Sequence, residues 1–252
     1  MDAVADIFRH WVRPKYLVVS LPFLIPLAAL AYWLLSPPSE EELRAERRQA
    51  FAAELAQLMP RVMAHDPAAL IRAGVIARDG LTGRRDPGQA AIWFSEAAER
   101  GSGQAGYYVG RLYELGQGVR LDYRRAAEWY RLAAKLGNNA DAQFALGELY
   151  FKGRGVANDY KEAIDWYRKA AEGGNPGAQA LVGSLFEKGG LVDRDYAEAY
   201  KWLSLAARRR VEAMAYDGGV DPRKELENLI PKMSRLERMR GDQKLRAFAV
   251  AN

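Results

Sequence analysis

The chain has 252 residues, no cysteine and only two histidines, His10 and His65. These counts exclude a disulfide framework and leave too few residues for the usual zinc sites and nucleophile–base pairs. The formal net charge is +5, but basic residues alternate with acidic ones and no nucleic-acid-binding motif occurs. We therefore expect no enzymatic activity, no metal or other cofactor, no small-molecule substrate and no nucleic-acid partner.

The first predicted element is a transmembrane helix at residues 16–35, which follows a cytoplasmic N-terminal segment at 1–15. The stretch has no charged residue over twenty positions. Twenty helical residues rise about 30 Å, which is the thickness of the hydrocarbon core of a bilayer. Pro22 and Pro26 each remove a backbone donor, so we expect a kink there and packing of these two positions against other membrane helices.

Two other interpretations of residues 16–35 stay open. A cleaved signal peptide also has a basic front and an apolar stretch, and Ala29-Leu30-Ala31 has the pattern of a cleavage site. The apolar run continues past that site to Leu35, which argues against cleavage. A buried core helix is the second interpretation, although the repeats described below leave no central place for a helix that is apolar all round.

The flanking charges set the predicted orientation of this span. Three basic residues precede it at positions 9 to 15, and three follow it at positions 44 to 48, behind acidic residues at 40 to 42. The basic residues nearest the span lie before it, which favours a cytoplasmic N-terminus. We therefore predict a single-pass protein of the bacterial inner membrane with periplasmic repeats, and we expect anionic membrane lipid to attract its basic side chains.

A stalk or N-capping helix is predicted at residues 36–66. Ser39 and Glu42 have the spacing of a capping box directly after two prolines, so a helix should begin there and run towards Met59. Apolar residues recur along it at helical spacing. We expect this apolar stripe to dock on the first repeat and cover its open end.

A repeat fills the middle of the chain. A glycine is followed nineteen residues later by a tryptophan four times, and successive units begin 36 or 37 residues apart. The four pairs are Gly74/Trp93, Gly110/Trp129, Gly147/Trp166 and Gly183/Trp202. A fixed period of this size is typical of stacked helix pairs, which have no buried pocket for chemistry but a long face that usually binds another protein.

The residues between these markers predict the two helices of each unit and the turn that joins them. The turns Gly116-x-Gly118 and Gly153-x-Gly155 supply residues that adopt positive φ readily. They follow a helix and lack a third glycine, so they are not dinucleotide-binding loops. Asp122 and Asp159 stand where an N-cap of the second helix is expected, and Gly137 and Gly174 where a C-cap is expected. A set of aromatic residues is predicted to lie in the core: Tyr113, Trp129, Tyr150 and Trp166.

These positions resemble the Sel1-like repeat, a relative of the tetratricopeptide repeat with a longer turn between its helices. The resemblance covers residues 67–210 and implies an all-α fold, a right-handed α-solenoid of four helix hairpins. The transmembrane helix predicted above precedes it. The outer repeats depart from the pattern, with Gly80-Leu81-Thr82-Gly83 and Gly189-Gly190-Leu191-Val192 as their turns, as expected of terminal repeats. The alternative is a globular all-α domain whose alanine-rich helices recur by accident.

The resemblance also implies which residues line the concave, protein-binding face. In tetratricopeptide-like units these residues lie on the first helix, three positions before its glycine and one and four positions after it. Carried onto this sequence, the rule gives Ile71, Val75, Arg78, Tyr107, Arg111, Glu114, Phe144, Glu148, Phe151, Ala180, Ser184 and Glu187. An apolar run among them that faced water would need a partner. Packing against a neighbouring helix or the stalk is the alternative.

After the repeats, residues 211–252 are predicted to form C-terminal capping helices. The segment up to Gly219 is interpreted as a linker. Asp221 and Pro222 are an N-cap and first-turn pair that opens a short helix, and Pro231 interrupts the chain before a last helix from Ser234. We expect this last helix to pack through Leu236, Met239, Leu245 and Phe248. Sel1-like domains commonly end in such a helix, which shields the last unit.

The leading hypothesis is thus a membrane-anchored Sel1-like scaffold or adaptor that mediates protein–protein interaction in a cell-envelope complex. Its expected partners are membrane or periplasmic subunits of that complex. The second hypothesis is an accessory structural subunit of a membrane enzyme, transporter or secretion machine, integrated through its transmembrane helix.

Overall fold

The computed structural model describes residues 38–137, 139–216 and 219–251. The chain divides into two compact units, Met1–Arg47 and Arg48–Asn252, and each is considered by itself. The predicted span at 16–35, with its two prolines, lies outside the described residues. Among the helices that are described, none combines the length and the apolar character needed to cross a bilayer.

Helix α3 (Glu40–Met63) begins with the predicted capping box. The backbone N–H of Ser39 donates to the Glu42 carboxylate at 2.7 Å, and the N–H of Glu42 donates to the Ser39 hydroxyl at 3.2 Å. The bond from the Ser39 backbone, with that from its hydroxyl, lowers the pKa of Glu42. The helix continues past the expected end at Met59 because it tolerates Pro60 inside its last turn.

The part of α3 that belongs to the second unit packs on the first repeat. Its apolar residues Leu55, Leu58, Met59 and Val62 contact the cluster that contains Leu70. Arg72 on the next helix donates two hydrogen bonds to Glu54, at 2.6 and 2.8 Å. The apolar stripe predicted from the sequence therefore covers one side of the first repeat.

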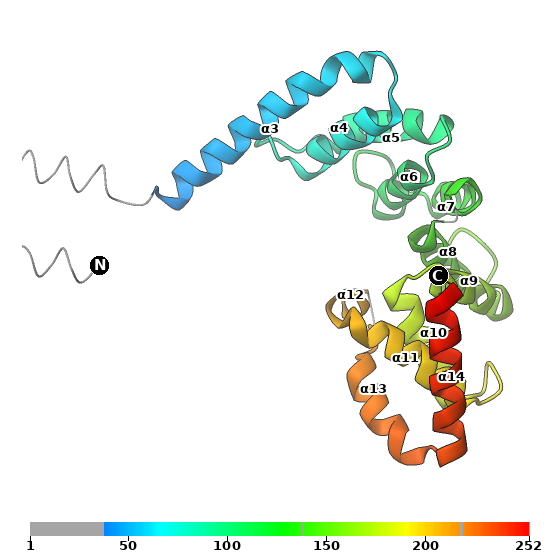
Figure 1. Ribbon diagram of the computed structural model, residues 1–252. Helices are drawn as coiled ribbons and strands as arrows, with labels where there is room; N and C mark the ends of the chain where they lie inside the picture. Colours follow the sequence, from blue (N-terminus) through cyan, green and yellow to red (C-terminus); the bar gives the residue numbers. More distant parts are fainter. Residues whose placement is uncertain (1–37, 138, 217–218, 252) are drawn as a thin grey trace, which may run out of the picture. The chain divides into compact units, whose positions relative to one another are not determined.

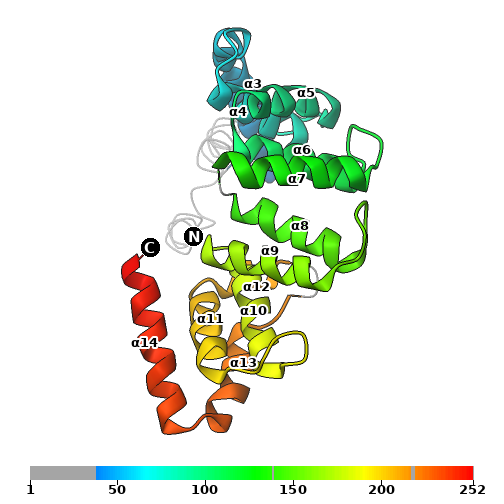
Figure 2. The ribbon, with the colours of Figure 1, turned by 90° about the vertical axis from the view of Figure 1, so that its right-hand side faces the viewer.

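Residues 67–208 form four helix pairs that stack in chain order (Figures 1 and 2). The pairs are α4 (Pro67–Asp79) with α5 (Pro87–Glu99), α6 (Gly103–Leu115) with α7 (Tyr123–Gly137), α8 (Ala140–Lys152) with α9 (Tyr160–Glu172), and α10 (Pro176–Lys188) with α11 (Tyr196–Arg208). The second helix of each pair also packs against the first helix of the next pair. The described residues thus form an all-α repeat solenoid, in agreement with the repeat part of the predicted fold class.

A glycine holds the two helices of each pair close together. A Cβ atom on Gly110 would lie only 2.4 Å from the ring of Tyr130. The other pairs repeat this contact between the glycine and the residue after the tryptophan, in Gly74/Phe94, Gly147/Tyr167 and Gly183/Leu203. The residue after the tryptophan therefore fills the space over the glycine. The expected core residues Tyr113, Trp129, Tyr150 and Trp166 are half-buried and pack against the core clusters.

The two predicted N-caps are found, and both predicted C-caps are shifted. Asp159 accepts from the backbone N–H of Glu162 at 3.0 Å and so caps α9, and Asp122 caps α7 in the same way. Gly137 is the last residue of α7 rather than a cap after it. Gly173 caps α9, and Gly174 follows it with a φ of +87°.

The C-terminal region forms α12 (Arg210–Met214), α13 (Pro222–Leu229), the 3₁₀ helix η1 (Ile230–Lys232) and α14 (Arg235–Ala251). Helix α12 stands where the sequence predicts a linker. Helix α14 packs along α11, where Phe248 meets Trp202 edge-on with ring centroids 5.3 Å apart. Leu236 and Met239, expected to pack, are instead 55% and 61% exposed.

Candidate functional site

We call the surface made by the predicted positions on α4, α6, α8 and α10 the first-helix face. On α4, Arg78 stacks on the ring of Tyr108 of α6, 4.9 Å from its centroid, and donates to Asp79 at 2.7 and 3.0 Å. Ile71 and Val75 are half-buried and pack against the core of their own repeat. At the first repeat, the face therefore offers a guanidinium on an aromatic ring rather than an open apolar patch.

On helix α6, a series of hydrogen bonds runs from a buried tyrosine to the surface. Tyr130 is fully buried, and its hydroxyl donates to the Glu114 carboxylate at 2.6 Å. Arg111, which is exposed, donates to the same carboxylate at 3.1 Å. Burial and then the charge of Glu114 raise the pKa of Tyr130, so it remains a protonated donor at neutral pH. Tyr107 is half-buried beside Tyr130, with ring centroids 6.0 Å apart.

Helix α8 repeats this chemistry with a carboxylate from another position. The hydroxyl of Tyr167 donates to Glu148 at 2.6 Å, and the ammonium of Lys152 lies 2.5 Å from the second oxygen of Glu148. Glu148 is one residue after its helix glycine, whereas Glu114 is four residues after Gly110. In both repeats a buried tyrosine of the second helix thus holds a carboxylate of the first helix in place.

The fourth-repeat end of the first-helix face is covered, which corrects the prediction for several residues. Phe144, Ala180, Ser184 and Glu187 are 8%, 1%, 4% and 6% exposed. The ring of Tyr216 meets Phe144 edge-on with centroids 4.8 Å apart. These residues do not form an open surface because the C-terminal elements of the chain lie on them.

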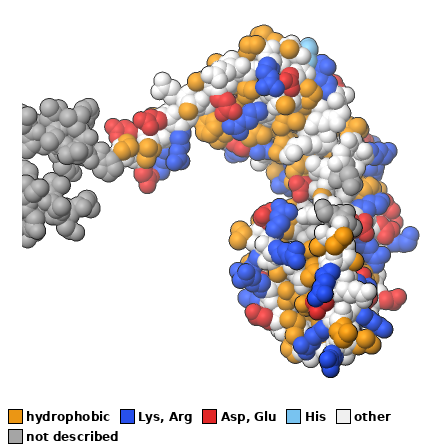
Figure 3. Space-filling view, in the orientation of Figure 1, with side chains coloured by type: hydrophobic (Ala, Val, Ile, Leu, Met, Phe, Trp, Pro, Cys, Tyr) orange, Lys and Arg blue, Asp and Glu red, His pale blue; other side chains and the backbone are white. Residues whose placement is uncertain are grey.

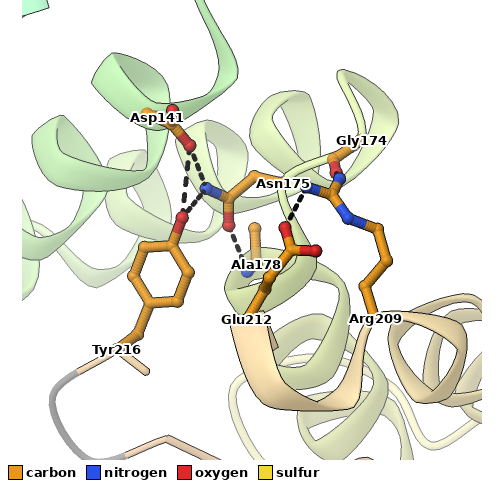
Figure 4. Close-up of polar contacts among 7 residues, drawn as sticks. All are labelled: Asp141, Gly174, Asn175, Ala178, Arg209, Glu212 and Tyr216. Carbon is orange, nitrogen blue, oxygen red and sulfur yellow. Dashed lines mark hydrogen bonds and ion pairs between the residues drawn. The ribbon is translucent and has the colours of Figure 1, made fainter. Parts of the chain in front are cut away.

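Figure 4 shows the polar contacts that hold this cover in place. The amide of Asn175 donates to Asp141 at 2.7 Å and to the Tyr216 hydroxyl at 2.6 Å, and that hydroxyl donates to Asp141 at 3.2 Å. The Asn175 oxygen caps α10 by accepting from the N–H of Ala178 at 2.7 Å. The three side chains come from α8, from the start of α10 and from the segment after α12, so they join three parts of the fold. We call them the Asp141 clasp.

Arg209 adds a second attachment for the same segment. It donates to the carbonyl oxygen of Gly174 at 3.2 Å and pairs with Glu212 of α12 (Figure 4). Phe151, by contrast, is 40% exposed and touches only the edge of Tyr160 among the aromatic rings of the described residues. The open part of the first-helix face therefore belongs to the first three repeats.

Several residues of this site were not found from the sequence. Tyr130 and Tyr167 occupy the same position after the tryptophan in two repeats, so the period itself could have revealed them. Tyr108 and Lys152 lie next to predicted positions, one residue away. Tyr216 lies after the periodic part of the sequence, where no repeated position points to it.

The surface is neither predominantly basic nor predominantly acidic. Basic and acidic side chains are interspersed on the face shown in Figure 3. His65 contacts Glu96 and, with Arg100, lowers the pKa of that carboxyl group. In the parts of the chain that the structure describes, no group of three or more metal-binding side chains is arranged to hold an ion. His10 lies outside these parts.

Comparison with known proteins agrees with the repeat architecture. A family model described as the Sel1 repeat matches residues 67–102, 104–138, 140–175 and 176–210. The solved structure of a Sel1 repeat protein from Oxalobacter formigenes is 27% identical, with a TM-score of 0.57, over 76% of this chain and 85% of that one. No match was found among the curated proteins.

Two further solved structures are similar at lower identity. One is c5321, a protective antigen with an SLR fold that is present in uropathogenic Escherichia coli strains. It is 22% identical with a TM-score of 0.47, and the match covers 81% of this chain and 52% of that one. The other is cysteine rich protein B of Helicobacter pylori. It is 22% identical with a TM-score of 0.43, and the match covers 53% of this chain and 96% of that one. The four matched repeats span more than half of the sequence, and the chain therefore belongs to the Sel1 repeat family.

Proposed function

We propose that this protein is a membrane-anchored scaffold that holds a partner protein on the first-helix face of its first three repeats. Sel1 repeat proteins are in general scaffolds for protein–protein interaction and typically are not enzymes. The observation that carries the proposal is the pair of carboxylates, Glu114 and Glu148, each fixed by a buried tyrosine and each paired with a cation on the open surface.

These groups are suited to recognition because their positions are set before a partner arrives. Arg111 and Lys152 are exposed, and Tyr107 on α6 adds half-buried aromatic area to the same face. Side chains that are already ordered lose less entropy on binding. A partner helix or extended segment with an apolar side chain for Tyr107 and acidic groups for the two cations fits this face.

The anchor belongs to the same proposal. Residues 16–35 have the length and composition of a membrane span. We propose a single-pass protein of the bacterial inner membrane, with a cytoplasmic N-terminus and periplasmic repeats. Its transmembrane helix confines the scaffold to the membrane and so raises its effective concentration near membrane partners. Integration as an accessory subunit, with Pro22 and Pro26 packed against the helices of a larger machine, is the alternative that the second experiment below addresses.

The first experiment tests the face. The double variant Tyr107→Ala/Arg111→Glu should lose the companions that co-purify with the full-length protein after mild detergent extraction. Lys135→Glu on exposed α7 is the matched control, because it makes the same charge change away from the first-helix face. Lys135→Glu should keep the melting temperature of the parent within a few degrees. The double variant should be less stable, because Tyr107 packs against the core, but should remain folded at the extraction temperature. Full retention of the companions by the double variant contradicts the proposed face.

The second experiment tests the anchor. Replacing residues 16–35 by an unrelated membrane span of equal length should preserve the companions if the segment is only an anchor. Loss of assembly with correct membrane insertion favours the integrated subunit instead. Protease added to intact spheroplasts should cut the repeats if they are periplasmic, and protection of the repeats contradicts the proposed orientation.

A further inference from the structure

Junctions between repeats are closed by a turn glycine. A Cβ atom on Gly118 would lie 2.3 Å from the backbone nitrogen of Gly88, at the start of α5. At the next junction, a Cβ on Gly155 would lie 2.3 Å from the carbonyl carbon of Tyr123, at the start of α7. No side chain fits at either position, so glycine allows each turn to rest directly on the preceding repeat.

The residue before the second of these glycines completes the closure. The guanidinium of Arg154 lies over the ring of Tyr123, 5.4 Å from its centroid. Together, Arg154 and Gly155 cover the first turn of α7, and Tyr123 is half-buried as a result. At this junction, an arginine–glycine step thus covers an aromatic residue at the start of a second helix.

The fourth repeat lacks this cover. Gly190 and Leu191 stand at the positions of Arg154 and Gly155. The chain leaves α10 in another direction, because Gly189 has ψ −165° where its counterpart Gly153 has ψ 34°. A Cβ on Gly190 would meet no atom within 4 Å, and Leu191 is 50% exposed. The turn does not close over the start of α9.

An open groove of about 700 Å³ lies at this junction, between α9 and the turn that follows α10. Tyr160, the counterpart of Tyr123, lines it and is 49% exposed. Its lining includes the apolar side chains of Ile164 and Phe186 and the carboxylates of Asp165 and Asp193. We call it the fourth-turn groove.

The charges of the groove favour a basic occupant. Three aspartates and two basic residues line it. Arg168 is engaged over the ring of Phe186, 5.4 Å from its centroid, and Lys161 is exposed. Asp165 and Asp193 form no ion pair within the residues that the structure describes. Two carboxylates beside a half-exposed tyrosine suit a guanidinium, which stacks on aromatic faces and binds carboxylates.

We propose that the fourth-turn groove binds an arginine–glycine step of a partner protein, with the arginine on Tyr160 and the glycine against the backbone at the start of α9. The partner then supplies what Arg154 and Gly155 supply inside the chain one junction earlier. The groove shares no lining residue with the first-helix face, although Phe151 of that face meets Tyr160. The proposal does not depend on the function proposed above.

The probe is a fluorescently labelled peptide with the sequence of residues 150–161, which contains the arginine–glycine step of the third repeat. It should bind the full-length protein in a fluorescence anisotropy titration. Peptides with alanine in place of the arginine, or leucine in place of the second glycine of the turn, should each bind about tenfold more weakly or worse, because one removes the stacked cation and the other blocks close approach. Absence of binding by the parent peptide, or equal binding by all three, overturns the proposal.

Variants of the protein locate the site. The double variant Gly190→Arg/Leu191→Gly gives the turn of the fourth repeat the arginine and glycine of the third. It should abolish peptide binding because the new arginine fills the groove. Tyr160→Ala should weaken binding about tenfold, whereas its matched control Tyr123→Ala should not. Asp193→Lys, on an exposed residue, tests the charge of the groove without relying on the rebuilt turn and should also weaken binding. Unchanged affinity in the Tyr160→Ala and Asp193→Lys proteins contradicts the assignment.

Discussion

The hydroxyl of Tyr130 lies 2.6 Å from a carboxylate oxygen of Glu114, and this bond joins the buried interior of the second repeat to its exposed face. The ring of Tyr130 also fills the space over Gly110. One side chain therefore holds the two helices together and fixes a carboxylate whose paired cation, Arg111, we propose to contact a partner. Tyr167 and Glu148 do the same in the third repeat, at the same distance.

Replacing Tyr130 by phenylalanine removes this hydrogen bond and keeps the ring. We expect the free energy of unfolding to fall by about 1.5–3 kcal/mol, because hydrogen bonds to charged groups contribute about that much. Urea denaturation measures the change, and Tyr167→Phe should give a similar value. A Tyr130→Phe protein as stable as the parent contradicts the role given to the hydroxyl.

Alkaline conditions should destabilise the protein through the same two tyrosines. Burial is the largest cause that raises the pKa of Tyr130 and Tyr167 above the ordinary value of 10.0. Above that pH the unfolded chain loses protons that the folded protein keeps, so the free energy of unfolding falls as the pH rises. The contribution of these two tyrosines to the free energy of unfolding is fully present below pH 10 and decreases as the pH rises above it. The double variant Tyr130→Phe/Tyr167→Phe should show a shallower fall between about pH 9.5 and 11, and an identical slope disproves the linkage.

Gly110→Ala tests the close contact inside a helix pair. The new methyl group would lie 2.4 Å from the ring of Tyr130, so the ring or the helix must move. Overpacking of this kind costs about 1–3 kcal/mol. Gly88→Ala is the control, because the nearest atom to its new Cβ lies 3.5 Å away and alanine favours a helix. Thermal unfolding should show a lower melting temperature for the first variant only.

Phe144→Ala and Phe151→Ala should separate buried from open positions of the first-helix face. Phe144 is 8% exposed and Phe151 is 40% exposed. Removing the first ring leaves a cavity between Tyr167 and Tyr216 and should cost about 3 kcal/mol. Removing the second should cost less than about 1 kcal/mol. Equal losses in urea denaturation would show that the cover over Phe144 is absent in solution.

Asn175→Asp tests the Asp141 clasp by replacing the side-chain NH2 group with a carboxylate oxygen. The new side chain keeps an acceptor for Ala178, but its second oxygen faces the carboxylate of Asp141. We expect a loss of about 2–3 kcal/mol at neutral pH, because the donor is removed and two like charges meet.

The pH dependence of this variant follows from that repulsion. Two neighbouring carboxylates raise the pKa of one member in the folded protein. The deficit relative to the parent should therefore be largest at pH 7 and shrink towards about pH 4, where one carboxylate takes up a proton. A deficit that stays constant over this range contradicts the clasp geometry.

Local signals in the sequence predicted the helices well. Ser39 and Glu42 define the start of α3, and Asp159 defines the start of α9, because a cap depends only on residues within one turn. The period of the glycines predicted the helix pairs, since each glycine contact lies within one repeat unit. The family match agrees with these predictions over residues 67–210.

The sequence could not show which part of the face is covered. The rule that selected Phe144 and Glu187 assumes that the first helices stay open along the whole array. Tyr216 and Lys232, which contact these two residues, come from segments without a repeat pattern. Contacts between residues so far apart in sequence depend on where the terminal helices fold back, and no short motif records that. Helix α12 escaped prediction because five residues are too few for a periodic signal.

The Asp141 clasp also bears on how this array can evolve. Arrays of this kind gain and lose units by duplication, and each unit contacts only its neighbours. The clasp ties the third helix pair to a residue beyond the fourth, 75 positions along the chain. An extra unit inserted between Asp141 and Tyr216 would pull the two apart, whereas one added before α8 would leave them together. The clasp is therefore compatible with additional units at the amino-terminal end of the array and not within its last repeat.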